Sequence, residues 1–151
     1  MELFRISSEK YSKGLVSSGR PNRWNKNGEH VIYTGGSRSL STLELIVHRN
    51  FIKPDIIYKV LIISVPDSEN IIKTVKTKDL PDNWRKLEAY SKLQEIGSDW
   101  IQSKETLLLK VPSAVIPQEQ NYIINIEHSD FKRKVKLVRS EEYFWDEGLL
   151  Q

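Results

Sequence analysis

Apolar residues recur along the chain with two different periods, and these periods predict its secondary structure. Alternating or short continuous apolar runs predict strands, and several of these runs end at Gly or Pro. The predicted strands cover residues 3–6, 31–34, 56–65, 70–76, 106–111, 122–126 and 135–138.

Two further segments have helical character. In residues 39–49 the spacing of apolar positions predicts a helix, and its inner face is expected to carry Leu40, Leu43, Ile46 and Val47. Residues 81–102 are also helical in character, with Gly97 as the expected break between two helices. Strands and helices that do not strictly alternate predict an α+β fold, in which one compact domain spans residues 1–151 and helices flank mixed strands.

The composition fits a protein that folds by burial alone. Hydrophobic residues make up 38% and charged residues 28%, which is typical of globular chains and not of disordered ones. The absence of cysteine excludes disulfides, thiolate nucleophiles and thiolate-rich zinc sites, and it suits a reducing compartment. Charged residues interrupt the first six positions, and no run approaches the ~20 apolar residues of a membrane span. We therefore expect a cytoplasmic protein without membrane association.

The formal net charge of +3 is mildly basic, and part of the positive charge is concentrated in one segment. This basic segment contains Lys132, Arg133, Lys134, Lys136 and Arg139. Such a run is usually a solvated face of a strand or helix, while a surface for nucleic acid or an acidic partner is the alternative.

Residues 17–28 are polar and rich in Ser, Asn and Gly, which predicts a long loop of the kind that often has a functional role. Arg23 lies in this loop, where its planar guanidinium could bind a phosphate or carboxylate through two parallel hydrogen bonds. Arg20 is a weaker candidate for the same role, and for both residues a solvated side chain is the simpler alternative. Alternation along the first strand places Arg5 opposite Phe4 and Ile6, facing either solvent or a cleft.

Glu44 is the first candidate for catalysis. It follows Leu40 by four residues and precedes Val47 by three, so helical spacing places its carboxylate beside the apolar stripe. One explanation is a capping box, in which Ser41 begins the helix and Glu44 bonds back to the backbone. The other is a carboxylate that lines a cleft and stabilises positive charge developing on a bound sugar.

Tyr33 and Ser113 are candidates for binding. The Tyr33 ring could stack on a planar heterocycle while its hydroxyl stays in water, or it could simply pack in the core. No nucleophile-elbow glycines or neighbouring base accompany Ser113, so a hydrogen-bonding role is favoured over acylation. His30, His48 and His128 lack the paired spacing of metal ligands, and no metal site is expected.

Seven short segments, taken together, resemble the RES domain in order and spacing across nearly the whole chain. They are Asn-Arg-Trp-Asn at 22–25, Val-Ile-Tyr-Thr at 31–34, Thr-Leu-Glu-Leu-Ile-Val-His at 42–48, Leu-Pro-Asp-Asn-Trp at 80–84, Gly-Ser-Asp-Trp-Ile at 97–101, Val-Pro-Ser-Ala-Val-Ile-Pro at 111–117 and Asn-Tyr-Ile-Ile-Asn at 121–125, with Gly28 and His128. The arginine, glutamate and serine for which that family is named fall on Arg23, Glu44 and Ser113.

The resemblance implies a fold similar to that of ADP-ribosyltransferases and the role of toxin in a bacterial toxin–antitoxin pair. It further implies an enzyme that depletes NAD+ by hydrolysis or phosphorolysis of the nicotinamide–ribose bond, with NAD+ as substrate and no cofactor. The implied protein partner is an Xre-type antitoxin, through which alone the toxin would meet nucleic acid. Some family members instead transfer ADP-ribose to a protein, and this alternative stays open.

The resemblance also implies roles for individual residues. Glu44 would stabilise the cationic ribose, Arg23 would bind the pyrophosphate, and Arg5 would assist Arg23 or fix the nicotinamide ribose. Tyr33 would stack on nicotinamide, and Ser113 would form a hydrogen bond near the reacting end.

Two segments depart from the family pattern. Pro21-Asn22 stand where the family commonly has Gly-Gly, and residues 146–149 read Asp-Glu-Gly-Leu instead of Asp-Pro-Arg-Leu. Substrate binding and antitoxin docking are the features that these departures would alter. Two alternatives of other classes are a nucleic-acid-binding or nuclease toxin that uses the basic segment, and a catalytically inactive domain that binds a partner.

Overall fold

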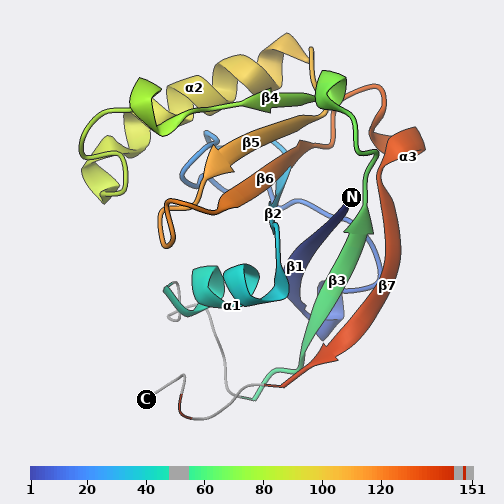
Figure 1. Ribbon diagram of the computed structural model, residues 1–151. Helices are drawn as coiled ribbons and strands as arrows, with labels where there is room; N and C mark the ends of the chain where they lie inside the picture. The colour runs from blue at the N-terminus through green and yellow to red at the C-terminus, as the bar shows by residue number, and fades with distance from the viewer. Residues whose placement is uncertain (48–54, 145–147, 149–151) are drawn as a thin grey trace.

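The computed structural model (Figure 1) describes residues 1–47, 55–144 and 148, and within these residues it is a single α+β domain with one seven-stranded mixed sheet. The strands are β1 (Glu2–Ser8), β2 (Val31–Gly35), β3 (Tyr58–Ser64), β4 (Ile72–Thr74), β5 (Leu108–Pro112), β6 (Gln120–Asn125) and β7 (Lys136–Tyr143). The described residues also form the helices α1 (Arg38–Val47), α2 (Tyr90–Ser103) and α3 (Phe131–Lys134), and the short 3-10 turns η1 (Glu9–Tyr11), η3 (Glu69–Ile71), η4 (Thr77–Asp79) and η5 (Leu87–Ala89). The predicted α+β class and all seven predicted strands are confirmed.

The sheet has the strand order β4-β5-β6-β2-β1-β3-β7, and it is nearly divided between β2 and β1. Only β4 and β5 are parallel, and the pairing of β1 with β2 is limited to Phe4 opposite Gly35. The β1 strand pairs with β3 over its full length, from Glu2 opposite Ser64 to Ser8 opposite Tyr58. Figure 1 shows the result: β5 and β6 lie across the picture, whereas β1, β3 and β7 run roughly from bottom to top. The two halves of the sheet therefore diverge beyond their junction.

Apolar side chains fill both faces of the sheet, which explains the continuous apolar runs in the sequence. Leu108 belongs to one buried cluster with Ile32 and Ile124, while its neighbour Leu109 belongs to another with Trp100 and Ile123. The α2 helix contributes Leu93, Trp100 and Ile101 to the second cluster and so covers the half of the sheet that contains β5 and β6.

The helix α1 is rotated relative to the prediction. It begins at Arg38, where the hydroxyl of Ser37 accepts a hydrogen bond from the Leu40 amide at 3.0 Å. Leu40 is buried as predicted and Ile46 is half-buried, whereas Leu43 and Val47 are 39% and 60% exposed, so the predicted inner face is wrong for these two residues. Ser41 is also buried, and its hydroxyl donates to the Phe4 carbonyl at 3.0 Å, so this face of the helix lies against β1. His48 and Arg49, the last residues of the predicted helix, lie outside the described residues.

The second helical prediction also needs correction. Residues 81–86 form turns, and α2 is one continuous helix that contains Gly97 in its interior. The predicted break at Gly97 is wrong because this glycine serves close packing: a Cβ there would lie 1.7 Å from the carbonyl oxygen of Trp24. The absence of a side chain lets the loop that contains Trp24 lie directly on the helix.

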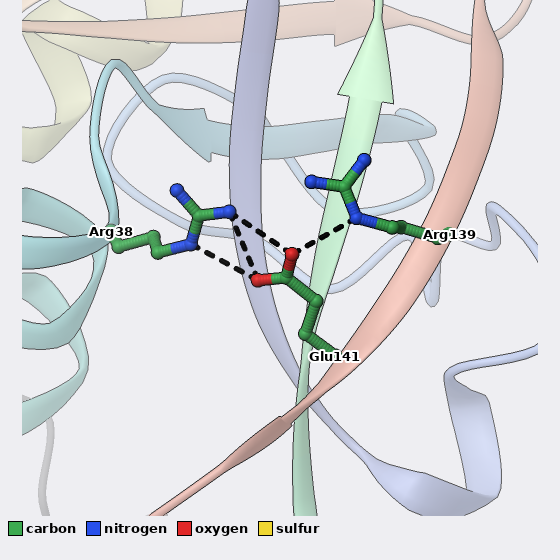
Figure 2. A network of polar contacts seen from close by, with 3 residues as sticks. All are labelled: Arg38, Arg139 and Glu141. Atoms are coloured by element: carbon green, nitrogen blue, oxygen red, sulfur yellow. Dashed lines mark hydrogen bonds and ion pairs between the residues drawn. The ribbon is translucent and has the colours of Figure 1, made fainter.

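Two polar contacts connect α1 to the strand β7 at the edge of the sheet. Figure 2 shows the Glu141 carboxylate between two arginines: Arg38 donates from Nε and Nη2 at 2.9–3.1 Å, and Arg139 donates from Nε at 3.0 Å. The two guanidinium groups, Arg38 first, lower the pKa of the Glu141 carboxyl. One turn further along α1, the Tyr143 hydroxyl donates to Thr42 Oγ1 at 2.9 Å. These contacts help to fix the helix that carries Glu44.

Candidate functional site

A cleft of about 530 Å³ lies at the junction of the two halves of the sheet. It is lined by β1, the loop of residues 17–25, β2, α1, the end of β5 and the start of β6. Divergence of β1 from β2 opens this space, and chain segments far apart in sequence meet in it. A cleft of this size is large enough for a small-molecule ligand.

Glu44 lines the cleft, and one of its carboxylate oxygens is held by two donors. Oε1 accepts hydrogen bonds from Ser113 Oγ at 2.6 Å and from Asn121 Nδ2 at 2.7 Å. Among the described residues, Oε2 has no hydrogen-bond partner. The capping-box explanation is wrong, because Ser37 caps α1 and the Glu44 side chain points to β5 and β6 instead of its own helix start. The carboxylate is thus held in one orientation with one oxygen left for a ligand.

Ser113 is fully buried behind Glu44 and does not line the cleft. Its Oγ accepts hydrogen bonds from the amides of Val115 and Ile116, both at 3.0 Å. Because these amides occupy the lone pairs of Oγ, the hydroxyl hydrogen is directed to Glu44. The structure therefore brings Ser113 to the carboxylate and not to the cleft surface.

Arg23 stands at the tip of a tight turn in the predicted loop. The backbones of Asn22 and Asn25 bond to each other in both directions, at 3.1 and 3.4 Å, which leaves Arg23 and Trp24 between them. The buried Asn25 amide donates to the carbonyls of Arg20, Lys26 and Glu29, and so it fixes the whole loop. The loop is therefore ordered around Asn25, a residue that the sequence analysis did not single out.

The Tyr33 hydroxyl is part of the same arrangement. It donates to Asn25 Oδ1 at 2.6 Å and accepts from the Trp24 amide at 3.0 Å, and burial raises the pKa of the phenol. The alternative in which this hydroxyl stays in water is wrong, since the hydroxyl is bonded to the loop, whereas packing against the core is confirmed. Tyr33 still lines the cleft while it also packs against the cluster that contains Trp24.

One face of α2 supports the loop from below. Tyr90, Gln94, Gly97 and Ser98 recur at the spacing of a single helical face. The guanidinium carbon of Arg23 lies 4.8 Å from the centre of the Tyr90 ring, in a cation–π contact. Gln94 donates to the Asn22 carbonyl at 2.9 Å, Gly97 meets Trp24, and Ser98 donates to Glu29 at 2.7 Å. The Arg23 side chain itself donates to the Trp84 carbonyl at 3.1 Å.

Arg5 and Arg20 line the cleft together with Arg23. Burial lowers the pKa of the Arg5 guanidinium, and within the described part of the chain no acceptor is bonded to it. Arg20 is exposed at the mouth of the cleft. Of the two alternatives for the Arg5 side chain, a position in the cleft is confirmed and a position in open solvent is wrong.

The remaining candidates lie away from the cleft. In the basic segment Lys132 and Arg133 are exposed, and Asp130 pairs with Arg133 at 2.6 Å and with Lys134 at 3.0 Å. The His128 Nδ1 accepts the Asp130 amide at 3.0 Å, and the His30 ring lies against Gly19. Over residues 1–47, 55–144 and 148, no three His, Asp or Glu side chains gather closely enough to hold a metal ion. In the same residues no helix has the length and apolar character that would let it cross a bilayer.

Sequence reasoning missed three residues of the site: Asn25, Tyr90 and Asn121. Asn121 lines the cleft at the second position of β6 and donates to Glu44. Asn121 begins one of the segments that resemble the RES domain, but an asparagine near the start of a strand usually indicates a turn, so no role was assigned to it. Asn121 and Tyr90 contact residues that are distant in the sequence, Glu44 and Arg23, and Asn25 bonds to carbonyls of its own loop.

Known proteins match this chain over nearly its full length. The RES domain family model matches residues 2–146. The protein named Toxin Res from Yersinia enterocolitica is 31% identical over 153 residues, which cover 99% of this chain and 99% of the relative. The Prs ADP-ribosylating toxin of a Sphingobium species is 34% identical over 130 residues, which cover 85% of this chain and 80% of the relative. A further Toxin Res, from Photorhabdus laumondii, is 28% identical over 155 residues, covering 100% of this chain and 98% of the relative. With one family model spanning nearly every residue and relatives matched end to end, this chain belongs to the RES domain family.

Proposed function

We propose that this protein is the toxin of a bacterial toxin–antitoxin pair and that it cleaves the bond between nicotinamide and ribose in NAD+. The observation that carries the proposal is the Glu44 carboxylate, held through Oε1 and free at Oε2, in a cleft that three arginines also line. A relative whose name describes ADP-ribosylation supports it, because NAD+ is the usual donor of ADP-ribose.

The chemistry explains why a fixed carboxylate is needed. When the bond from ribose C1′ to the nicotinamide nitrogen breaks, its electron pair goes to nicotinamide, which leaves as a neutral molecule without a general acid. Positive charge then develops on the ribose, and a carboxylate beside it stabilises that transition state. A preorganised group of this kind contributes about 3–4 kcal/mol, or a few hundredfold in rate. Glu44 is the residue we assign to this role.

The arginines supply the binding energy that holds the dinucleotide in place. Arg23 would bind the pyrophosphate through N–H groups not used by Trp84, with Arg20 or Arg5 as the second cation. Half-buried and without a described acceptor, Arg5 is suited to an anionic or hydroxyl oxygen of the ligand. Tyr33 would offer its ring to nicotinamide while its hydroxyl holds the Arg23 loop. Ser113 would act through Glu44 instead of touching substrate.

Three acceptors can complete the reaction, and one experiment separates them. Water adds to C1′ and loses a proton to give ADP-ribose, whereas phosphate gives ADP-ribose 1″-phosphate, and a protein side chain gives a modified protein. The purified protein is incubated with NAD+ in buffer without phosphate, then with phosphate, then with cell extract. Nicotinamide release in the first condition indicates hydrolysis and in the second alone phosphorolysis. Release only with extract supports the alternative of a protein ADP-ribosyltransferase.

The toxin role is tested in cells. We expect neutralisation by an Xre-type antitoxin, action in the cytoplasm where NAD+ is available, and no direct contact with nucleic acid. Induction of the protein without an antitoxin should lower cellular NAD+ before growth stops, while RNA and DNA stay intact. Degraded RNA with unchanged NAD+ would support the nuclease alternative that uses the basic segment, and unchanged NAD+ with normal nucleic acids would indicate an inactive partner-binding domain.

A further inference from the structure

Asn121 shares the carboxylate oxygen of Glu44 with Ser113. Its Nδ2 donates to Glu44 Oε1 at 2.7 Å, and Ser113 Oγ donates to the same oxygen at 2.6 Å. The position of Asn121 is fixed from both sides, because it lies opposite Gly35 on β2 and opposite Val111 on β5. Two rigid neighbours thus hold the amide against the carboxylate.

The other end of the same amide is left without a partner. Asn121 Oδ1 is buried, and no described residue donates a hydrogen bond to it. A buried acceptor without a donor reduces the stability of the folded state, and folded proteins seldom retain one. Exchange of the amide oxygen and nitrogen would not relieve it, since an acceptor would then face the acceptor oxygen of Glu44. The amide therefore keeps its hydrogen bond from Nδ2 to Glu44, while its own Oδ1 stays without a donor.

We infer that Asn121 is a positioning residue, which holds the Glu44 carboxylate in the orientation that leaves Oε2 for the ligand. The two donors on Oε1 restrain the side chain from turning, so the carboxylate is in place before the substrate arrives. This inference rests on the proposed function and adds to it a residue that acts through Glu44.

The other ionisable groups that line the cleft with Glu44 are Arg5 on β1, Arg20 and Arg23 in the loop, and the Tyr33 phenol on β2. Arginine and tyrosine side chains in general titrate far above the pH range in which a carboxyl group does. A change in the acid side of the pH–rate profile would therefore report Glu44 and its immediate partners.

The decisive variant is Asn121→Asp, which keeps the shape and replaces the donor with a second carboxyl group. Two carboxyl groups that share one site hold a proton between them to higher pH. We expect kcat for nicotinamide release at neutral pH to fall at least tenfold with a smaller change in KM. The acid limb of the pH–rate profile should move upward by about 1 unit or more. Asn83→Asp is the matched control, because Asn83 also donates to a glutamate, Glu88, at 3.1 Å, on the exposed surface outside the cleft.

A second measurement does not depend on turnover. In protein labelled with 13C at the glutamate carboxyl, the Glu44 signal is assigned by its loss in Glu44→Gln, and its titration midpoint is compared between wild type and Asn121→Asp. An upward shift supports the inference even if NAD+ proves not to be the substrate, in which case the wild type shows the NMR coupling without nicotinamide release. An unchanged midpoint and an unchanged pH–rate profile would overturn it. So would unfolding of both Asn121→Asp and Asn121→Ala, since Asn121 would then be structural.

Discussion

The hydroxyl of Ser113 donates to the carboxylate of Glu44 across 69 positions of sequence, at 2.6 Å, and is itself directed by two backbone amides. Removal of this hydroxyl in Ser113→Ala frees one side of Glu44 and leaves the amides of Val115 and Ile116 without an acceptor. We expect a stability loss of about 1–3 kcal/mol. We also expect slower nicotinamide release by the protein that remains folded. Tm and nicotinamide release are measured on one preparation.

A matched control separates the two effects of Ser113→Ala. Ser12 is also buried, and its hydroxyl donates to the Glu9 carbonyl at 2.8 Å, away from the cleft. Ser12→Ala should lose stability and keep its turnover. If Ser113→Ala behaves in the same way, the serine has no role in directing Glu44.

Packing of the Arg23 loop on α2 depends on Gly97. An alanine there would place a methyl group against the Trp24 carbonyl, and the loop or the helix would have to move. Overpacking of this kind typically costs about 1–3 kcal/mol, so Gly97→Ala should lower Tm and raise KM for NAD+ by displacing Arg23. Gly14→Ala is the control, because nothing lies within 4 Å of a Cβ at that position. Equal Tm values for the two variants would contradict the packing account.

Arg5 illustrates a conflict between stability and binding. Burial disfavours its charge, and no described acceptor compensates for the lost hydration. Arg5→Met keeps much of the apolar volume and removes the charge, so we expect a higher Tm together with weaker NAD+ binding. Thermal unfolding and isothermal titration check both effects, and a variant with lower Tm and unaltered affinity would show that Arg5 serves the fold.

The ion pairs of Glu141 with Arg38 and Arg139 predict how the stability of the fold depends on pH. Because Arg38 and Arg139 lower the pKa of Glu141 below the ordinary value of 4.5, the pair stabilises the fold above that value and the effect is lost as pH falls through the lowered pKa. The Tm difference between wild type and Glu141→Gln should therefore be present at neutral pH and vanish in acid. High salt should also reduce it, since the pair is exposed. A difference that grows on acidification would contradict this assignment.

Local patterns in the sequence were sufficient for the strands and for the position of Glu44 beside the core. They failed where a contact between distant segments decides the outcome. Helical spacing could not show that Ser41 bonds to the Phe4 carbonyl, so its place on the buried face of α1 was not predicted. Gly97 looked like a helix break, because its true neighbour, Trp24, lies in a loop 73 positions earlier.

The polar partners within the site were the hardest to predict. Of the two alternatives for Tyr33, neither included a hydroxyl bonded to the loop, and Asn121 was part of a segment that resembles the RES domain but was assigned no role. Each acts through a hydrogen bond that exists only once β2, β6 and the loop of residues 17–25 have assembled. The type of a polar residue determines which hydrogen bonds it can donate or accept, and only the fold determines its partners.

The central claim is that one fixed carboxylate makes NAD+ cleavage possible, and Glu44→Gln tests it most directly. Nicotinamide release and Tm are measured on wild type, Glu44→Gln and Glu95→Gln, the last being an exposed glutamate on α2. We predict a loss of at least a hundredfold in kcat for Glu44→Gln alone, with all three proteins folded. Equal nicotinamide release by Glu44→Gln and wild type would contradict the account.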